Sequence, residues 1–168
     1  MERIGRVKAI YITPEQGNLD NPVSMQELES VQVIEGVGLV GDRYASGNGF
    51  WQNADNKKPV EKRKIRQISL ISAEDIRSGN EENRTNIEES DTRRNIVVEG
   101  IENLQQFIGK NLVVGESEIS VTGDCDACNR PSKMAKKDGF EKFGKRGGIR
   151  GKVNKTGLIR KNDDIFVL

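Results

Sequence analysis

Histidine is absent from this chain of 168 residues, and cysteine occurs only twice, as Cys125 and Cys128. A structural zinc site needs four ligands, so zinc here would require carboxylates or a second chain. Two cysteines are also too few for the disulfide framework of a small secreted domain. A thioredoxin-like pair needs alternating strands and helices around the Cys-x-x-Cys motif, which the flanking segments lack. We therefore expect free thiols or metal ligands in a reducing compartment.

Long apolar runs, aromatic residues and excess charge are also lacking. No run approaches the roughly 20 apolar residues of a membrane helix, and residues 1–13 contain no apolar signal core. Aromatics make up 5% of the chain and the net charge is +1, which argues against a nucleic-acid-binding barrel. We expect a cytoplasmic protein with neither membrane nor nucleic acid as a partner. Its length fits a single domain, residues 1–168.

The sequence does contain many short strand-like runs, bounded by Gly, Asn or Asp. They cover residues 5–13, 31–34, 65–72, 95–101, 111–115, 118–123, 157–160 and 164–168. The last two belong to a Gly-rich stretch, residues 145–168, that looks like a closing hairpin. This pattern is typical of a mostly β protein, either a barrel or a sandwich.

Helical signals are fewer. Ser72 is a candidate cap for a helix over residues 72–78, and residues 101–109 are compatible with one or two turns. A third helical pattern covers residues 129–144, from a start near Pro131 to an end at a glycine. Residues 44–64 are polar and Gly/Asn-rich, which predicts a loop or lid around the single tryptophan.

Charge is unevenly distributed. Residues 125–152 contain nine Lys or Arg against three acids, whereas residues 72–91 contain seven acids against two Arg. Solvated surface is one reading of both segments. The other reading is a basic rim beside the cysteines that suits an anionic ligand, with Lys145, Arg146 and Arg150 extending an anion-binding wall.

The Cys-x-x-Cys segment follows a predicted strand, at a place where a side chain can face a cleft. Two small buried thiols in a turn are one possibility, but the polar neighbours Asp124 and Asp126 do not look like core. Nearby Arg130 and Lys133 favour a reactive thiolate, which is also a suitable ligand for a soft metal.

Two further motifs carry arginine. Residues 36–45, GVGLVGDRYA, present the planar guanidinium of Arg43 after Gly41 and Asp42. Taken alone, this motif predicts a β-turn with a surface ion pair rather than a binding site. In residues 91–101, DTRRNIVVEGI, Arg93 and Arg94 precede an apolar run. Side chains alternate along a strand, so at most one of these two arginines should face inward.

In this order, these motifs resemble the MOSC domain, named for the C-terminal region of molybdenum-cofactor sulfurase. The resemblance extends over nearly the whole chain and implies a distorted β-barrel that binds molybdenum cofactor through a pterin dithiolene and one protein cysteine. The family's cysteine follows a Pro or Ala, which makes Cys128 the implied metal ligand and catalytic residue. The residues implied or expected to bind the cofactor are Gly41, Asp42, Arg43, Arg93, Arg94, Asn95, Lys133 and Arg146. Some branches carry a histidine motif that this chain lacks.

Related proteins reduce N-hydroxylated compounds, so the resemblance implies a small molybdoenzyme with a small-molecule substrate. Its electrons would come from a separate flavin or iron–sulfur partner, because the chain has no recognisable site for either group. The alternative is a non-catalytic carrier of the cofactor, or of sulfur as a persulfide on Cys128. In that case Cys125 could act as a resolving thiol.

Overall fold

The computed structural model describes residues 1–14, 17, 19–46 and 66–168. The strands are β1 (Glu2–Ile12), β2 (Gln26–Leu28), β3 (Ser30–Ile34), β4 (Gly38–Leu39), β5 (Ile68–Ser72), β6 (Ile96–Glu99), β7 (Asn111–Val114), β8 (Ser117–Asp124), β9 (Ile149–Lys155), β10 (Gly157–Arg160) and β11 (Asp164–Val167). The helices are α3 (Ala73–Asn83) and α4 (Asn129–Ala135), with 3₁₀ helices η1 (Glu89–Thr92), η2 (Leu104–Phe107) and η3 (Phe140–Gly147). The predicted loop around Trp51 lies outside the described residues, apart from its first three positions.

The main sheet closes into a barrel. Its strands follow the order β11-β7-β8-β9-β5-β6-β1, and β1 pairs again with β11, while β2 extends the sheet beyond β1. Neighbouring strands are antiparallel except for β5 and β6, which are parallel. A second sheet, β10-β3-β4, lies beside the barrel. The expectation of a mostly β barrel is confirmed.

The barrel interior is filled by alternating side chains. In β8, buried and half-buried residues alternate along the strand, as expected when one face packs on a core. Leu70, Ile96, Ile119 and Ile149 are completely buried in the same apolar cluster. A smaller cluster packs α3 and η3 against the outside of the barrel, with Ile71 and Phe140 at its centre.

Two sequence expectations about local structure were wrong. The C-terminal strands do not form a closing hairpin, because β9 pairs with β5 and β8 while β10 pairs with β3 in the other sheet. The helix expected over residues 129–144 is divided into α4 and η3. The break occurs at Lys136 and Gly139, which both adopt positive φ angles, 55° and 112°. The expected cap of α3 is confirmed, since the Ser72 hydroxyl accepts from the Asp75 N–H over 3.1 Å.

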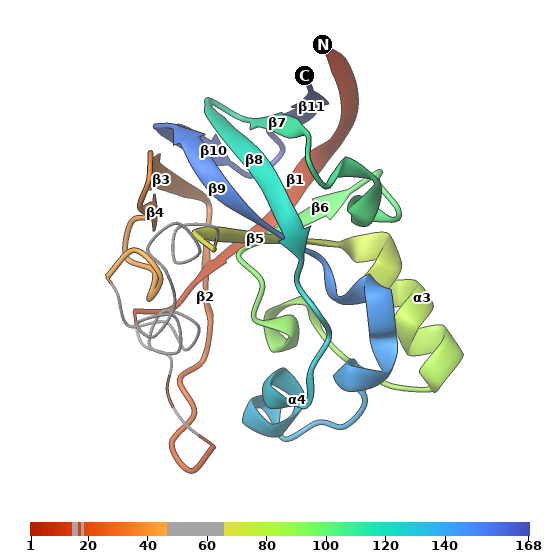
Figure 1. Cartoon of the computed structure of the whole chain (residues 1–168). Coiled ribbons are helices and arrows are strands. Elements are labelled where there is room, and N and C mark those ends of the chain that lie inside the picture. The colour runs from red at the N-terminus through yellow and green to blue at the C-terminus, as the bar shows by residue number, and fades with distance from the viewer. Residues whose placement is uncertain (15–16, 18, 47–65) are drawn as a thin grey trace.

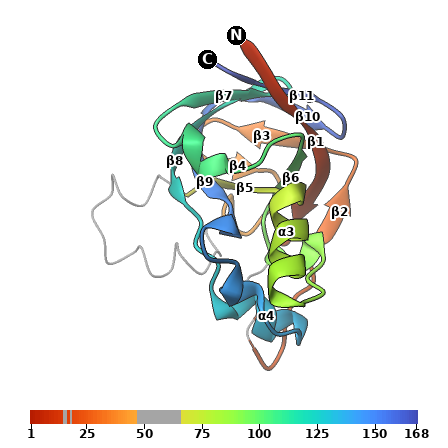
Figure 2. The ribbon, with the colours of Figure 1, turned by 90° about the vertical axis from the view of Figure 1, so that its right-hand side faces the viewer.

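Most of the helices gather at one end of the barrel. The chain termini lie at the opposite end from α4, and α3, α4, η1 and η3 lie toward the lower end in both views, whereas η2 packs higher, beside β8 (Figures 1 and 2). Strand β8 ends at this helical side and continues directly into the Cys-x-x-Cys segment and α4 (Figure 1). Within the described residues, no helix is long and apolar enough to cross a bilayer.

Candidate functional site

A small cavity lies where the barrel meets its helical end. Its volume is about 30 Å³. Its lining consists of Arg43, Tyr44, Arg66, Ile68, Ser69, Arg93, Arg94, Cys125 and Arg150, and we call it the arginine cavity. Five of these residues are arginines and none is Asp or Glu, so the lining attracts a negatively charged group.

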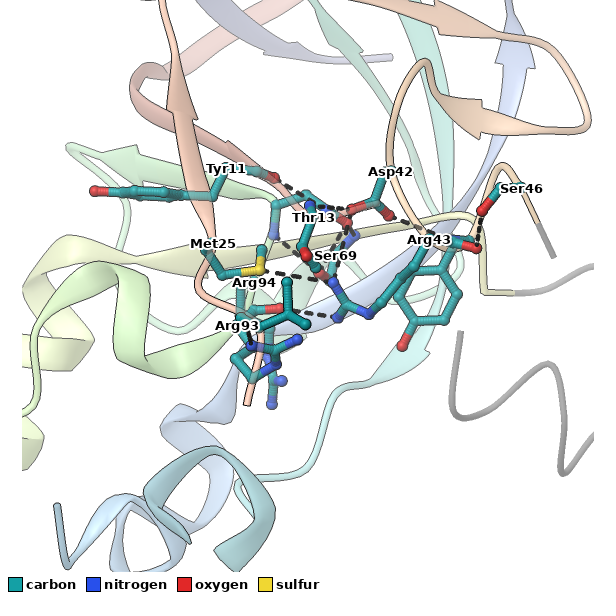
Figure 3. Close-up of polar contacts among 12 residues, drawn as sticks. Tyr11, Thr13, Met25, Asp42, Arg43, Ser46, Ser69, Arg93 and Arg94 are labelled. Carbon is teal, nitrogen blue, oxygen red and sulfur yellow. Dashed lines mark hydrogen bonds and ion pairs between the residues drawn. The ribbon is translucent and has the colours of Figure 1, made fainter. Parts of the chain in front are cut away.

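The turn after β4 positions the first of these arginines. Asp42 is completely buried, and its carboxylate accepts from the N–H of Thr13 at 3.1 Å and of Tyr44 at 3.3 Å (Figure 3). The Arg43 guanidinium lies 3.6 Å from the same carboxylate. Burial raises the pKa of Asp42, and the charge of Arg43 opposes that shift. Gly41 has a positive φ of 87°, which lets the chain turn sharply into this pair.

The guanidinium of Arg43 is held from several sides. Its exposed fraction is 3%, it stacks 4.8 Å from the centre of the Tyr44 ring, and it donates to the Met25 sulfur at 3.6 Å. It also donates to the carbonyl of Arg93 at 3.5 Å (Figure 3). Its Nε atom is buried with no hydrogen-bond partner among the described residues, as is the Nε of Arg150. Buried donors of this kind favour an additional acceptor in the cavity.

Both arginines of the 91–101 motif line the cavity, so the expectation that only one would face inward was wrong. Arg93 has a positive φ of 59° and lies outside β6, so strand alternation does not govern the two side chains. Burial and the nearby Arg43 lower the pKa of Arg93 to about 10. Arg93 therefore remains charged at neutral pH, at a cost in desolvation.

Arg94 fixes the cysteine segment to the barrel. It donates to the main-chain carbonyls of Cys125 and Asp126, each at 3.0 Å, and to that of Gly147 at 2.8 Å. Its guanidinium also lies 5.4 Å from the centre of the Phe140 ring. These bonds commit most of its donors to the protein, so Arg94 shapes the cavity wall.

Asn95 connects two strands of the barrel through its side-chain hydrogen bonds. Its side-chain oxygen accepts from both the main-chain N–H and the hydroxyl of Ser69, each at 3.1 Å, and its amide donates to the Tyr11 carbonyl at 3.2 Å. Asn95 thereby joins β5 to β1 beneath the cavity, and it is absent from the cavity lining.

The two cysteines occupy different environments. Cys125 is half-buried and lines the arginine cavity, whereas Cys128 is exposed at the residue that precedes α4. Sequence reasoning singled out Cys128, and the cavity-facing position of Cys125 had no signal beyond the shared motif. Among the residues described, no three His, Cys, Asp or Glu side chains gather to form a metal site.

The other predicted residues divide between the cavity and the surface. Arg150 of β9 lines the cavity, donates to the Asp124 carbonyl and has its pKa lowered by burial. Arg146 instead pairs with Glu82 at 2.7 Å and does not line the cavity. Lys133 is exposed on α4.

Sequence reasoning also missed Arg66 and Tyr44 as lining residues. Tyr44 precedes and Arg66 follows the segment 47–65, which lies outside the described residues, and neither side chain was singled out by its motif.

One family model matches this chain, and several solved structures share its fold. The family model of the MOSC domain matches residues 57–166. The structure resembles the crystal structure of YuaD from Bacillus subtilis, with a TM-score of 0.73 and 19% identity over 96% of this chain and 93% of that one. YiiM from Geobacillus stearothermophilus has a TM-score of 0.66 and 12% identity, over 97% of this chain and 74% of that one. YiiM from Escherichia coli has a TM-score of 0.60 and 13% identity, over 97% and 69%. No curated protein matches.

Proposed function

From the premise that this chain belongs to the MOSC domain family, we propose that it binds molybdenum cofactor with the cofactor's phosphate end in the arginine cavity. The family is associated with binding of that cofactor. The observation that carries the proposal is the lining itself: five arginines, no acid, and two buried Nε donors that lack a partner among the described residues. A phosphate offers several acceptor oxygens and the charge that such a lining favours.

The size of the cavity limits which part of the cofactor it can enclose. A volume of about 30 Å³ is roughly that of one water molecule, so the cavity can take an oxygen of the phosphate at its mouth and not a pterin. The remainder of the cofactor, including its metal, would therefore lie outside the cavity. The exposed thiol of the chain is Cys128, three residues along the chain from Cys125. We accordingly keep Cys128 as the proposed metal ligand and assign Cys125 to the cavity wall.

The residues of this chain would bind the cofactor and orient it. Arg43 and Arg150 would donate to the phosphate, and Arg94 would hold the cysteine segment in place through its carbonyls. The bound cofactor would supply two-electron redox chemistry and oxygen-atom transfer.

We propose as the reaction the reduction of an N-hydroxylated compound to the corresponding amine and water. It consumes two electrons and two protons, and a separate flavin or iron–sulfur protein would supply the electrons. Tyr44 lines the arginine cavity, where burial raises the pKa of its phenol, so it would stay protonated and donate to the phosphate. Oxidation of a reduced dye by the loaded protein with an N-hydroxylated substrate tests the activity.

The exposure of Cys128 favours a second candidate, a carrier that delivers the cofactor or sulfur to another protein. An exposed thiol can be reached by a partner protein, whereas an enclosed one cannot. A loaded protein that oxidises no dye with any N-hydroxylated substrate, yet activates a cofactor-free molybdoenzyme, would establish the carrier.

Cofactor binding is tested by purifying the protein from two hosts, one with and one without cofactor biosynthesis, and measuring molybdenum and pterin. We expect both, in equal amounts, only from the first host. Absence of molybdenum and pterin from both preparations, even after reconstitution with the free cofactor, would overturn the proposal.

A further inference from the structure

A second pocket lies beside the arginine cavity and shares Arg93 with it. Its volume is about 130 Å³. The segment before β2 contributes Pro22 and Met25, and α4 contributes Pro131 and Met134. We call it the methionine pocket. In Figure 3, Met25 and Arg93 lie on the side of the polar cluster that faces α4.

The pocket has room for one small ring against the Pro and Met side chains of its lining, although Ser24, Ser90, Asp91 and Arg93 line it too. An apolar protein cavity of about 150 Å³ holds one benzene molecule. Methionine side chains are flexible and polarizable, and their sulfur atoms make favourable contacts with aromatic rings. Met134 is 6% exposed, so its side chain is fixed against α4 and can form a stable wall.

The Arg93 guanidinium is the group of the pocket that could meet an anionic head on that ring. Asp91 lines the pocket, but its carboxylate accepts from Lys137 at 2.7 Å and from the Glu88 N–H at 2.9 Å. The remaining charged residue of the lining is Arg93, whose guanidinium is oriented by a 2.7 Å hydrogen bond to the Val23 carbonyl. A guanidinium presents a planar fork that matches a carboxylate.

We propose that the methionine pocket binds a small monocyclic carboxylate, with the ring between Met25 and Met134 and the carboxylate directed at Arg93. Binding of such a ligand requires no cofactor. Its interpretation as the substrate side of the molybdenum site rests on the proposed function, because Arg93 is the wall that the pocket shares with the arginine cavity.

Methyl NMR of the cofactor-free protein tests this directly. The chain has three methionines, and Met1 is 81% exposed and far from the pocket in sequence, so it serves as an internal control. With ¹³C-methyl methionine, sodium benzoate should shift the Met25 and Met134 signals together and saturably, leaving Met1 unchanged. Benzyl alcohol, which lacks the charge, and acetate, which lacks the ring, should each bind at least tenfold more weakly.

The Met134 signal distinguishes binding in the methionine pocket from binding in the arginine cavity. Met134 lines only the methionine pocket, whereas Met25 also contacts Arg43. A benzoate response confined to Met25, or one equalled by acetate, would place the anion in the arginine cavity and overturn the proposal. Absence of any saturable shift would overturn it as well.

A variant whose side chain fills the methionine pocket provides a second test of the proposal. Ser24 lines the pocket and is exposed, so Ser24→Trp should fold and abolish the Met134 response. Ser30→Trp, at an exposed position of β3, is the matched control and should bind benzoate like the wild type. Unchanged benzoate binding by Ser24→Trp would overturn the proposal. Neither result depends on molybdenum content, so failure here is distinguishable from failure of the proposed function.

Discussion

Arg94 donates from its Nη2 atom to the main-chain carbonyl of Cys125 over 3.0 Å, and so joins the start of β6 to the cysteine segment 31 residues away in sequence. The contact makes the position of the thiols depend on a side chain that never needs to touch a ligand. It accounts for an arginine of the cavity wall that has most of its donors directed at protein carbonyls.

The first prediction concerns this link. Arg94→Ala should lower the free energy of unfolding by at least about 2 kcal/mol, because a buried carbonyl left unpaired costs about 1–3 kcal/mol. Alkylation of Cys125 should also become faster, since the segment loses its anchor. Denaturant unfolding and mass spectrometry measure both effects.

Arg6→Ala is the control, because its ion pair with Glu99 is solvent-exposed and contributes roughly 0–1 kcal/mol. Equal stability losses for Arg94→Ala and Arg6→Ala would show that the Arg94 bonds are not structural.

A second prediction concerns the packing of η3 against the cysteine segment. A Cβ atom at Gly147 would lie 2.4 Å from the Ala127 nitrogen and 2.5 Å from the Cys125 carbonyl oxygen. These are main-chain atoms, so Gly147→Ala must displace the segment and should cost about 1–3 kcal/mol. The exposed neighbour Lys145→Ala should leave the melting temperature unchanged. A wild-type melting temperature for Gly147→Ala would contradict the described packing.

The two tyrosines give a prediction about pH. Burial, with the charges of Glu27 and Glu89, raises the pKa of Tyr11 to about 12, and burial also raises the pKa of Tyr44. Ultraviolet titration of the folded protein should therefore show no phenol ionising at the ordinary value of about 10. The unfolded chain releases these protons first, so their contribution to stability is full below pH 10 and is lost as pH rises toward 12. Tyr11→Phe should remove the step near pH 12, and a step at pH 10 in the folded wild type would contradict the burial.

The cysteines supply a fourth prediction. Cys128→Ser should lose molybdenum while Cys125→Ser keeps it, because only Cys128 is exposed outside the arginine cavity. Metal analysis of both variants, made in the same host and matched for melting temperature, measures the difference. The reverse pattern would assign the metal to Cys125 and contradict the assignment made from the resemblance.

Much of the barrel was predictable because its strands alternate and end at turn residues. Residues 118–123 predicted most of β8, and residues 111–115 predicted β7. Pairing was less predictable, since nothing local in β9 or β10 reveals that adjacent strands enter different sheets. The break between α4 and η3 depends on Lys136 adopting a left-handed conformation, and a lysine in the sequence does not predict that conformation.

The candidate site was also predictable only in part. Asp42 and Arg43 were singled out by the resemblance to the MOSC domain, since the Gly-Asp-Arg motif alone predicts only a turn with a surface ion pair. Arg146 and Arg150 looked equivalent in sequence, four residues apart in one basic stretch, yet one pairs with Glu82 and the other enters the cavity. The two arginines differ in position because β9 begins at Ile149, so only Arg150 belongs to a barrel strand.

The contrast between Arg150 and Arg146 provides the most direct test of the proposal that the cofactor's phosphate end binds in the arginine cavity. Arg150→Ala and Arg146→Ala remove the same charge from the same stretch, but only Arg150 lines the arginine cavity. Molybdenum and pterin should be measured per protein in both variants and the wild type, all produced in a host that makes the cofactor. We predict at least a tenfold loss of both for Arg150→Ala and wild-type content for Arg146→Ala; equal content in the two variants would contradict the placement of the cofactor in this cavity.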